Sequence, residues 1–514
     1  MNGAEALLQT LVASGVEVCF ANPGTSEMQL VAAIGKTDAM RPVLCLFEGV
    51  VSGAADGYAR MADKPAATLL HLGSGFSNSL ANMHNARRAG TCIVNIVGDH
   101  ASYHLEFDAP LTSDLPALAR WGSHWTEIAH SPEELSQAGA RAVQASLRGN
   151  GQIATVVAPA DHAWSDASEA APALPKPAPI DVPPERTKRI ADAIRTGEST
   201  LLLLGGAALR ERNLSQLGLI AEAHNVTLMS STFPTRLHRG EGRVPVQRMP
   251  YFAEQAAEVL APFQQLILLG TQAPVSFFAY PNIEGWLTPE HCTLMTLAEA
   301  GEDLSGTIEA LCDELGLEGE PSQRVTFAPQ EVSDAELTAV TIGQIINNEL
   351  PENTIVSDEG TTCGLAIYLF TEQARAHDWL TLTGGAIGQG LPLALGAALA
   401  CPDRKVLALQ ADGSAMYTIQ ALWSMARENA DVTVVLLNNR SYAILNIEMD
   451  RVGAEEVNEK TRSMLDLSNP DMDYASMARG LGIEASQART AAEFQEQFVN
   501  AMRKPGPCLI EAIL

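Results

Sequence analysis

Short, unbroken apolar runs recur along the whole chain, and each ends in a turn that precedes a longer stretch with helical spacing. The runs are rich in Val, Ile and Leu and lack polar alternation, which is typical of strands covered on both faces. The runs that predict strands are Val16–Phe20, Val43–Phe47, Ala67–His71, Cys92–Val97, Ile153–Val157, Leu201–Leu204, Val226–Met229, Leu266–Leu269, Thr354–Val356, Val406–Leu409, Val432–Leu437 and Cys508–Ile513. Because these runs alternate with helices, the pattern predicts an α/β fold of stacked, doubly wound parallel sheets.

Two stretches interrupt this pattern and are typical of linkers. Ser165–Thr187 carries six prolines among Ala and acidic residues, which favours a stiff, extended connector. Gly316–Glu336 is acidic and polar and contains two prolines. We therefore predict three domains, over residues 1–165, 187–318 and 335–514.

Length and charge agree with this division and exclude some partners. At roughly 150 residues a domain, 514 residues make about three domains. The formal net charge of −28 repels phosphate backbones and anionic lipid surfaces. We expect a small-molecule substrate, with neither nucleic acid nor a membrane as partner.

The cysteines and the N-terminal residues indicate the cellular compartment of the protein. Eight cysteines are scattered with no C-x-x-C pair and no zinc-ligand spacing, which is typical of reduced thiols. The first residues lack the basic and apolar segments of a signal peptide, and no apolar run reaches the ~18 residues of a membrane span. We therefore expect a cytoplasmic protein.

Polar residues follow two predicted strands in the last third of the chain. Val406–Gln410 is followed by Asp412, and Val432–Leu437 is followed by Asn439 and Ser441. Ligands of α/β folds bind at the carboxyl ends of strands. A carboxylate, an amide oxygen and a backbone carbonyl form a hard-oxygen set that suits Mg²⁺ and phosphate. Taken alone, Asp-Gly-Ser is also an ordinary turn.

The first third offers a second group of polar residues at strand ends. Glu48 follows the run Val43–Phe47 at a helix start, where a carboxylate is also favoured simply by the helix dipole. The segment Asn22–Glu27, which includes Thr25, follows the first run and reads equally as a turn. His71 ends another run, and a lone histidine there can be purely structural.

Three motifs together resemble a known family, the thiamine-diphosphate-dependent enzymes. These motifs are Asp412-Gly413-Ser414 with Asn438-Asn439 and Tyr442 about 27 residues later, the block Glu48-Gly49-Val50-Val51-Ser52-Gly53-Ala54-Ala55-Asp56-Gly57-Tyr58-Ala59-Arg60, and the segment Leu380–Gly388. The resemblance covers nearly the whole chain and implies a pyrimidine-binding, a middle and a diphosphate-binding domain. Ala411 stands where the family motif usually has glycine, and its Cβ would crowd the diphosphate.

The resemblance assigns roles to individual residues. It implies that Glu48 hydrogen-bonds N1′ of the aminopyrimidine, that the Gly385 carbonyl accepts from the 4′-amino group, and that Ile387 bends the cofactor. It implies that Mg²⁺ is held by Asp412, Asn439 and the Ser441 carbonyl. The remaining residues that it places around the diphosphate are Thr361, Gly413, Ser414 and Tyr442.

Within the family, the chain resembles acetolactate-synthase large-subunit-like proteins and benzoylformate decarboxylases. Thr25 falls at the substrate-binding serine of the latter, and His71 at their first active-site histidine. Their second histidine falls at Ala279, beside Phe277 and Phe278. The FAD-contacting segments of acetolactate synthases have no match here, so FAD is not expected.

The resemblance implies a thiamine-diphosphate- and Mg²⁺-dependent 2-oxoacid decarboxylase/carboligase of acetolactate-synthase type. Such an enzyme forms an enamine from one 2-oxoacid and adds it to an aldehyde or a second 2-oxoacid. A simple decarboxylase and a non-catalytic cofactor-binding relative remain alternatives. A Rossmann oxidoreductase would need Gly-x-Gly-x-x-Gly after the first strand, which is missing. We expect a homodimer or homotetramer, because family sites lie between two subunits.

Overall fold

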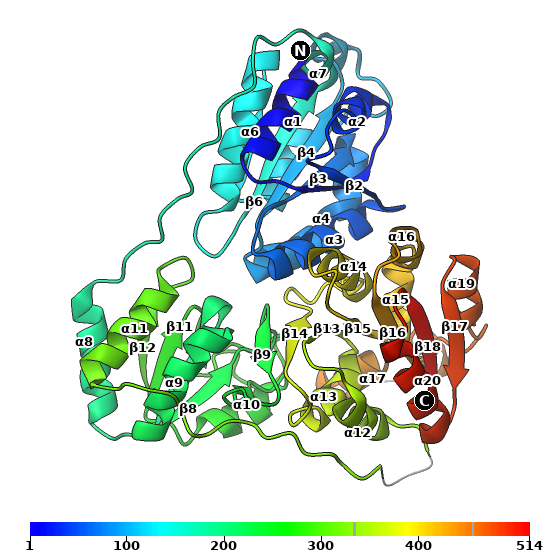
Figure 1. Cartoon of the computed structure of the whole chain (residues 1–514). Helices are drawn as coiled ribbons and strands as arrows, with labels where there is room; N and C mark the ends of the chain where they lie inside the picture. The colour runs from blue at the N-terminus through cyan, green and yellow to red at the C-terminus, as the bar shows by residue number, and fades with distance from the viewer. Residues whose placement is uncertain (333–335, 455–456) are drawn as a thin grey trace.

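The computed structural model describes residues 1–332, 336–454 and 457–514, which form three α/β units (Figure 1). Each unit is built on its own sheet, so the predicted α/β class with three stacked sheets is confirmed. The first unit lies at the top of Figure 1, with the second and third below it, side by side.

The first sheet has the strand order β2-β1-β3-β4-β6-β5, and its paired strands are parallel. Its strands are β1 (Val18–Asn22), β2 (Arg41–Leu44), β3 (Ala66–His71), β4 (Ile93–Asp99), β5 (Trp125–Ile128) and β6 (Ile153–Pro159). Its helices are α1 (Gly3–Ala13), α2 (Met28–Ile34), α3 (Glu48–Ala62), α4 (Leu72–Ala89), α5 (Leu115–Gly122), α6 (Pro132–Ser146) and α7 (Ala160–Trp164).

The strands of this unit depart from the predicted runs most clearly at β1 and β2. β1 runs on to Asn22, which brings that side chain to the end of the strand, and β2 ends at Leu44. Phe47 has extended backbone and precedes α3. Cys45 and Phe47 pack in the core at the start of this helix, whereas Leu46 is exposed.

The second sheet has the order β10-β8-β7-β11-β12 and is also parallel. Its strands are β7 (Thr200–Leu204), β8 (Val226–Ser230), β10 (Gln247–Arg248), β11 (Gln265–Leu269) and β12 (Thr293–Ala298). Its helices are α8 (Pro184–Arg195), α9 (Glu211–Ala223), α10 (Ala253–Leu260) and α11 (Leu304–Leu315).

The third sheet has the order β17-β18-β16-β15-β13-β14-β9. Its strands are β9 (Leu237–Arg239), β13 (Thr354–Glu359), β14 (His377–Thr381), β15 (Val406–Ala411), β16 (Val432–Asn438), β17 (Glu484–Ala488) and β18 (Cys508–Ile513). Its helices are α12 (Ala339–Glu349), α13 (Thr361–Phe370), α14 (Gly390–Ala400), α15 (Asp412–Thr418), α16 (Ala421–Glu428), α17 (Ala443–Arg451), α18 (Glu459–Arg462), α19 (Tyr474–Gly480) and α20 (Ala491–Arg503). Its other pairs are parallel, as predicted, but β9, a short edge strand from the middle of the chain, pairs antiparallel with β14.

The predicted linkers carry little regular structure. The described residues from 165 to 183 form only isolated bridges, but α8 begins at Pro184, inside the first predicted linker. Proline at the first turn of a helix is well tolerated, since its missing N–H has no partner there. Residues 333–335 of the second predicted linker lie outside the described residues. The domain boundaries 1–165, 187–318 and 335–514 stay predictions.

Helices α3 and α14 join the first unit to the third. A Cβ on Gly57 would lie 2.0 Å from the Leu393 carbonyl oxygen, and one on Gly396 would lie 1.9 Å from that of Ala54. Only glycine permits so close an approach of two helices. A single hydrophobic core therefore continues from the first sheet into the third. This contact fixes Glu48, at the start of α3, relative to the segment that precedes α14.

None of the helices in the described ranges combines the length and the apolar character that a membrane crossing requires.

Candidate functional site

Glu48 lies at the N-terminus of α3 and is only 7% exposed. Its Oε1 accepts a hydrogen bond from Asn22 Nδ2 at 3.1 Å, and its Oε2 accepts one from Asn78 Nδ2 at 3.0 Å. A Cβ on Gly75 would lie 3.0 Å from Oε1, so a larger residue there would press on the carboxylate. Glu48 is thus held in one orientation by two amide side chains that the sequence alone did not connect to it.

His71 and the segment that contains Thr25 meet beside this carboxylate. His71 ends β3, and its Nδ1 lies 2.7 Å from Oε2 of Glu27 and 3.3 Å from Oγ of Ser26. Thr25 begins the single 3₁₀ turn Thr25–Glu27 and is exposed. The structure therefore brings His71 next to the segment that contains Thr25, and it adds Glu27 as the partner of the histidine.

The backbone directly after His71 is strained. Leu72 has a φ of 49° and is buried, although the left-handed region is unfavourable for a bulky side chain. Strain of this kind concentrates at functional sites, where the surrounding structure holds it in place. Here it turns the chain sharply from β3 into α4 and leaves His71 at the strand end.

The predicted metal ligands meet at the ends of β15 and β16. Asp412 Oδ1 accepts from the backbone N–H of Gly413 at 2.7 Å, and Oδ2 accepts from that of Arg440 at 2.6 Å. Asn439 Oδ1 accepts from the Ser441 N–H at 3.0 Å. Burial raises the pKa of the Asp412 carboxyl. Backbone donors thus orient a carboxylate and an amide oxygen on adjacent strand ends.

Residues predicted to surround a diphosphate lie close to these ligands. Ser414 donates to the Ala411 carbonyl at 3.1 Å within the first turn of α15. A Cβ on Gly413 would lie 2.4 Å from the Tyr442 ring, so the ring lies directly over this glycine. Thr361 begins α13 with a φ of 47°.

The segment Gly384–Gly388 is held by α4 of the first unit. Asn85 Nδ2 donates to the Ala386 carbonyl at 2.7 Å, and Asn85 Oδ1 accepts from the Ala386 N–H at 3.1 Å. Gly385 has a φ of 75°, and a Cβ there would lie 2.6 Å from the Phe277 ring. Ile387 is half-buried beside it. The predicted aminopyrimidine segment therefore has a fixed backbone and an aromatic neighbour from the middle unit.

The predicted residues form two separate groups within one chain. The side-chain partners of Glu48 among the described residues, Asn22 and Asn78, belong to the first unit. The groups that donate to the Asp412 carboxylate are the backbone amides of Gly413 and Arg440, in the third unit. Glu48 and Asp412 are thus held in place by different units of the chain.

The donor chemistry of the third-unit group fits a magnesium diphosphate. Its ligands are oxygen atoms only, as Mg²⁺ prefers, and such sites are commonly completed by phosphate oxygens and water. Within the described ranges, no group of three or more His, Cys, Asp or Glu residues could hold a metal. The candidate therefore rests on one carboxylate with neutral oxygen ligands, which also suits a metal shared with a ligand phosphate.

Sequence reasoning missed two buried acids, Glu27 and Glu359. Glu27 lies in the segment Asn22–Glu27, in which we selected only Thr25 as a candidate site residue. Glu359 ends β13, and its signal was the one used for Asp412, an acid after an apolar run at a strand end.

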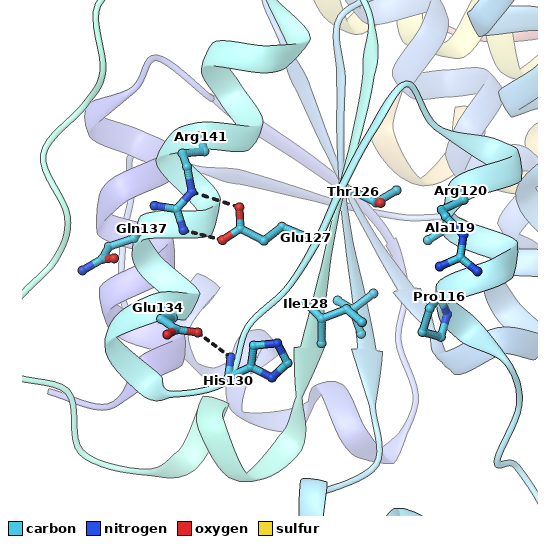
Figure 2. Close-up of a pocket in the computed structure, with 11 residues that line it drawn as sticks. Pro116, Ala119, Arg120, Thr126, Glu127, Ile128, His130, Glu134, Gln137 and Arg141 are labelled. Atoms are coloured by element: carbon cyan, nitrogen blue, oxygen red, sulfur yellow. Dashed lines mark hydrogen bonds and ion pairs between the residues drawn. The ribbon is translucent and has the colours of Figure 1, made fainter.

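A cavity of about 500 Å³ lies elsewhere in the first unit, beyond the edge strand β5 (Figure 2). Arg141 pairs with Glu127 there, and Glu134 accepts from the His130 N–H at 2.9 Å. None of the predicted site residues lines this cavity, so we assign it no part in the function.

Comparisons with known proteins define the family to which this chain belongs. Residues 1–127 match the thiamine pyrophosphate enzyme N-terminal TPP binding domain, and residues 358–512 match the C-terminal TPP binding domain. A Mycobacterium tuberculosis protein, provisionally named acetolactate synthase large subunit IlvX, is 48% identical over 100% of this chain and 99% of its own. The chain belongs to the thiamine-pyrophosphate enzyme family.

Two further relatives refine the comparison. Benzoylformate decarboxylase of Pseudomonas aeruginosa is 26% identical over 97% of this chain and 96% of its own. The solved structure of a Rhodococcus jostii thiamine diphosphate-dependent 4-hydroxybenzoylformate decarboxylase superposes with a TM-score of 0.87 at 24% identity, covering 100% of this chain and 99% of its own. The protein is thus a thiamine-diphosphate-dependent enzyme of the acetolactate synthase and decarboxylase family.

Proposed function

We propose that the protein is a Mg²⁺-dependent 2-oxoacid decarboxylase and carboligase of acetolactate-synthase type. The observation that carries the proposal is the fixed, nearly buried carboxylate of Glu48, whose two amide partners donate to it and leave further acceptor capacity. A carboxyl group in such a pocket is suited to share a proton with a ring nitrogen.

Each group of residues has a defined part in this proposal. Asp412, Asn439 and the Ser441 carbonyl would hold Mg²⁺, and Thr361, Gly413, Ser414 and Tyr442 would surround the diphosphate. Glu48 would bind N1′ of the aminopyrimidine, with the Gly385 carbonyl and Ile387 as its other contacts. When bound, thiamine diphosphate supplies an electron sink that allows CO₂ to leave a 2-oxoacid.

The substrate side of the site is assigned to His71 and Thr25. His71 would hold or deliver a proton at the reacting carbon, while Thr25, exposed at the start of its turn, would bind the substrate carboxylate. Glu27 would act through His71 as a positioning residue.

The middle unit favours addition to a second carbonyl compound over simple protonation. Ala279 provides no proton donor, and the nearby Phe277 and Phe278 are 42% and 53% exposed. Tyr280 is a weak acid whose pKa is raised further by burial. An apolar wall without a second donor slows protonation and leaves room for an aldehyde or another 2-oxoacid.

A simple decarboxylase remains the second candidate, and a specific observation favours it. The close pairing of His71 with Glu27 provides one well-oriented proton carrier, which suffices for product protonation.

Product analysis after incubation with pyruvate, alone and with an aldehyde, separates the two functions. Acetolactate or an acyloin is expected. Free aldehyde as the sole product would contradict the carboligase proposal and support the simple decarboxylase.

A further inference from the structure

We propose that Glu359 is a positioning residue that holds the Gly384–Gly390 segment in its cofactor-binding position and loosens it when the carboxylate takes up a proton. This inference rests on the proposed function, because it concerns the segment that would contact the aminopyrimidine. Glu359 itself is not predicted to touch substrate or cofactor.

The contacts of Glu359 lie at the exit of this segment. Glu359 is 2% exposed at the end of β13. Its Oε1 accepts from the Gly388 N–H at 2.6 Å, and its Oε2 accepts from the Gly390 N–H, the first residue of α14. One carboxylate therefore holds two backbone amides that bracket a single residue.

The geometry around Gly388 and Gly390 leaves the segment little freedom while both bonds persist. Gly388 has a φ of 97°, and its carbonyl accepts from Asn82 and Thr418 at 3.1 and 2.9 Å. A Cβ on Gly390 would lie 2.8 Å from the Cβ of Glu359. The first unit anchors one end of the segment through α4, and Glu359 anchors the other.

A second observation is an unused hydrogen-bond acceptor close to Glu359. Gln410 Nε2 donates to Glu359 Oε2 at 3.3 Å, while Gln410 Oε1 is buried with no hydrogen-bond partner among the described residues. The Oε1 of Gln410 and the Oε2 of Glu359 lie 2.5 and 2.9 Å from the same point, an ideal Cβ on Gly390. A protonated carboxyl could donate to this unused acceptor, but its O–H could no longer accept from the Gly390 amide.

Gln410 also connects Glu359 to the diphosphate-binding motif. Its Nε2 donates to Ser414 Oγ at 2.5 Å, and Ser414 belongs to the predicted diphosphate shell. A change at Glu359 is therefore adjacent to both parts of the proposed cofactor site.

The charged groups around Glu359 are already paired or face elsewhere. On its own strand, Asp358 accepts from Trp379 Nε1 at 3.1 Å and lies 3.9 Å from Arg248. Asp56, on α3, accepts a hydrogen bond from the Gln389 side chain and forms a buried ion pair with Arg60.

Helix α14 and the end of β15, which also pack against Glu359, add no unpaired charge beside it. Helix α14 has no charged residue, and the carboxylate of Asp412, after β15, is engaged by backbone amides. Because no cation among the described residues lies beside it, burial raises the pKa of Glu359 to about 7. The ionised, fully anchored state is thus favoured above neutral pH, and the protonated state below it.

Binding of thiamine diphosphate with Mg²⁺, followed by intrinsic fluorescence at pH 6 and pH 8, tests the proposal. In Glu359→Gln, the amide places an N–H where an acceptor is needed, so the variant imitates the protonated state. Loss of one anchoring hydrogen bond predicts about fivefold weaker binding than wild type at pH 8. At pH 6 the two proteins should bind equally.

Glu511→Gln is the matched control. Glu511 is another buried carboxylate of the same sheet, and it accepts from Asn438 and the Ala475 N–H at 2.7 and 3.0 Å. The ratio of the cofactor affinity of Glu511→Gln to that of the wild type should be the same at both pH values. A ratio for Glu359→Gln that does not change with pH would overturn the inference. Failure of the wild type to bind the cofactor at either pH would instead contradict the proposed function.

Hydrogen exchange of the wild-type protein provides a test that does not depend on a variant. After correction for intrinsic exchange rates, peptides covering residues 384–392 should be better protected at pH 8 than at pH 6. Equal protection at both pH values would overturn the inference even if Glu359→Gln failed to fold.

Discussion

The Nδ1 atom of His71 lies 2.7 Å from Oε2 of Glu27, a carboxylate that is completely buried. Glu27 also accepts from the Gly24 N–H at 2.7 Å and from Ser26 Oγ at 2.6 Å. Whenever the Glu27 carboxylate is ionised it can only accept, which places the hydrogen on Nδ1 and leaves Nε2 to exchange protons with a ligand. In that state Glu27 holds both the orientation and the tautomer of the imidazole.

Replacing Glu27 should separate this positioning role from binding. Glu27→Gln offers a donor or a neutral acceptor to Nδ1 and no longer enforces one tautomer. We expect kcat to fall about 10–100-fold, the range for residues that orient a functional histidine, with little change in KM. Steady-state kinetics with the best 2-oxoacid measures this, with Glu17→Gln, an exposed acid of the same unit that pairs with Lys64, as the control. A kcat equal to that of the wild type would show that the pair is only structural.

Glu48→Gln should leave the fold intact while it weakens proton sharing with the aminopyrimidine. The loss of activity should be about 10²–10⁴-fold, as is typical of general acid–base groups. Exchange of the acidic ring proton of the bound cofactor, followed by NMR, should slow in parallel. Glu17→Gln, on an exposed side chain paired with Lys64, is the control. Wild-type exchange in Glu48→Gln would remove Glu48 from this role.

Asp412→Ala should abolish Mg²⁺-dependent binding of thiamine diphosphate, because no other carboxylate belongs to the proposed ligand set. Asp412→Asn keeps an oxygen ligand and should bind more weakly than the wild type but measurably. Calorimetric titration with and without Mg²⁺ compares these variants with Asp403→Ala, which changes an exposed acid of the same unit. A titration of Asp412→Ala that matches the wild type would place the metal elsewhere.

Mixing two inactive variants tests whether a site is completed by two subunits. If Glu48 and Asp412 of different chains form one site, dimers of Glu48→Gln with Asp412→Ala contain one intact site of two. Random exchange then restores roughly a quarter of wild-type activity in a two-fold dimer. The two variants are dissociated or unfolded and then reassembled, together in one sample and separately in two others. The activity that each sample recovers is measured. No recovery from confirmed mixed dimers would show that each chain builds its own site.

Most of the fold could be predicted because buried parallel strands leave continuous apolar runs. The strands that escaped prediction lack such runs. β17 is the polar edge strand Glu484–Ala488, and β14 contains Asp378, a buried acid paired with Arg236 and Arg404. Asp378 is buried because arginines from distant parts of the chain neutralise it, and the polar residues of β17 lie at an exposed sheet edge, so neither strand leaves an apolar run.

The candidate site was predictable where residues lie at strand ends and less so where tertiary contacts decide. Asp412 and Asn439 could be placed together because adjacent parallel strands end at one edge of a sheet. The partners of Glu48 come instead from the end of β1 and from α4, and that of His71 from a 3₁₀ turn, so the packing of separate elements decides them. Glu27 lies 44 positions from His71 in the sequence, and nothing local connects them.

We propose that the protein decarboxylates 2-oxoacids with thiamine diphosphate and Mg²⁺. CO₂ release from a panel of 2-oxoacids is measured with protein stripped of cofactor, with and without added thiamine diphosphate and Mg²⁺. We expect release that requires both additions and that is lost in Glu48→Gln and Asp412→Ala. Cofactor binding without CO₂ release from any 2-oxoacid would contradict this function and favour a non-catalytic relative.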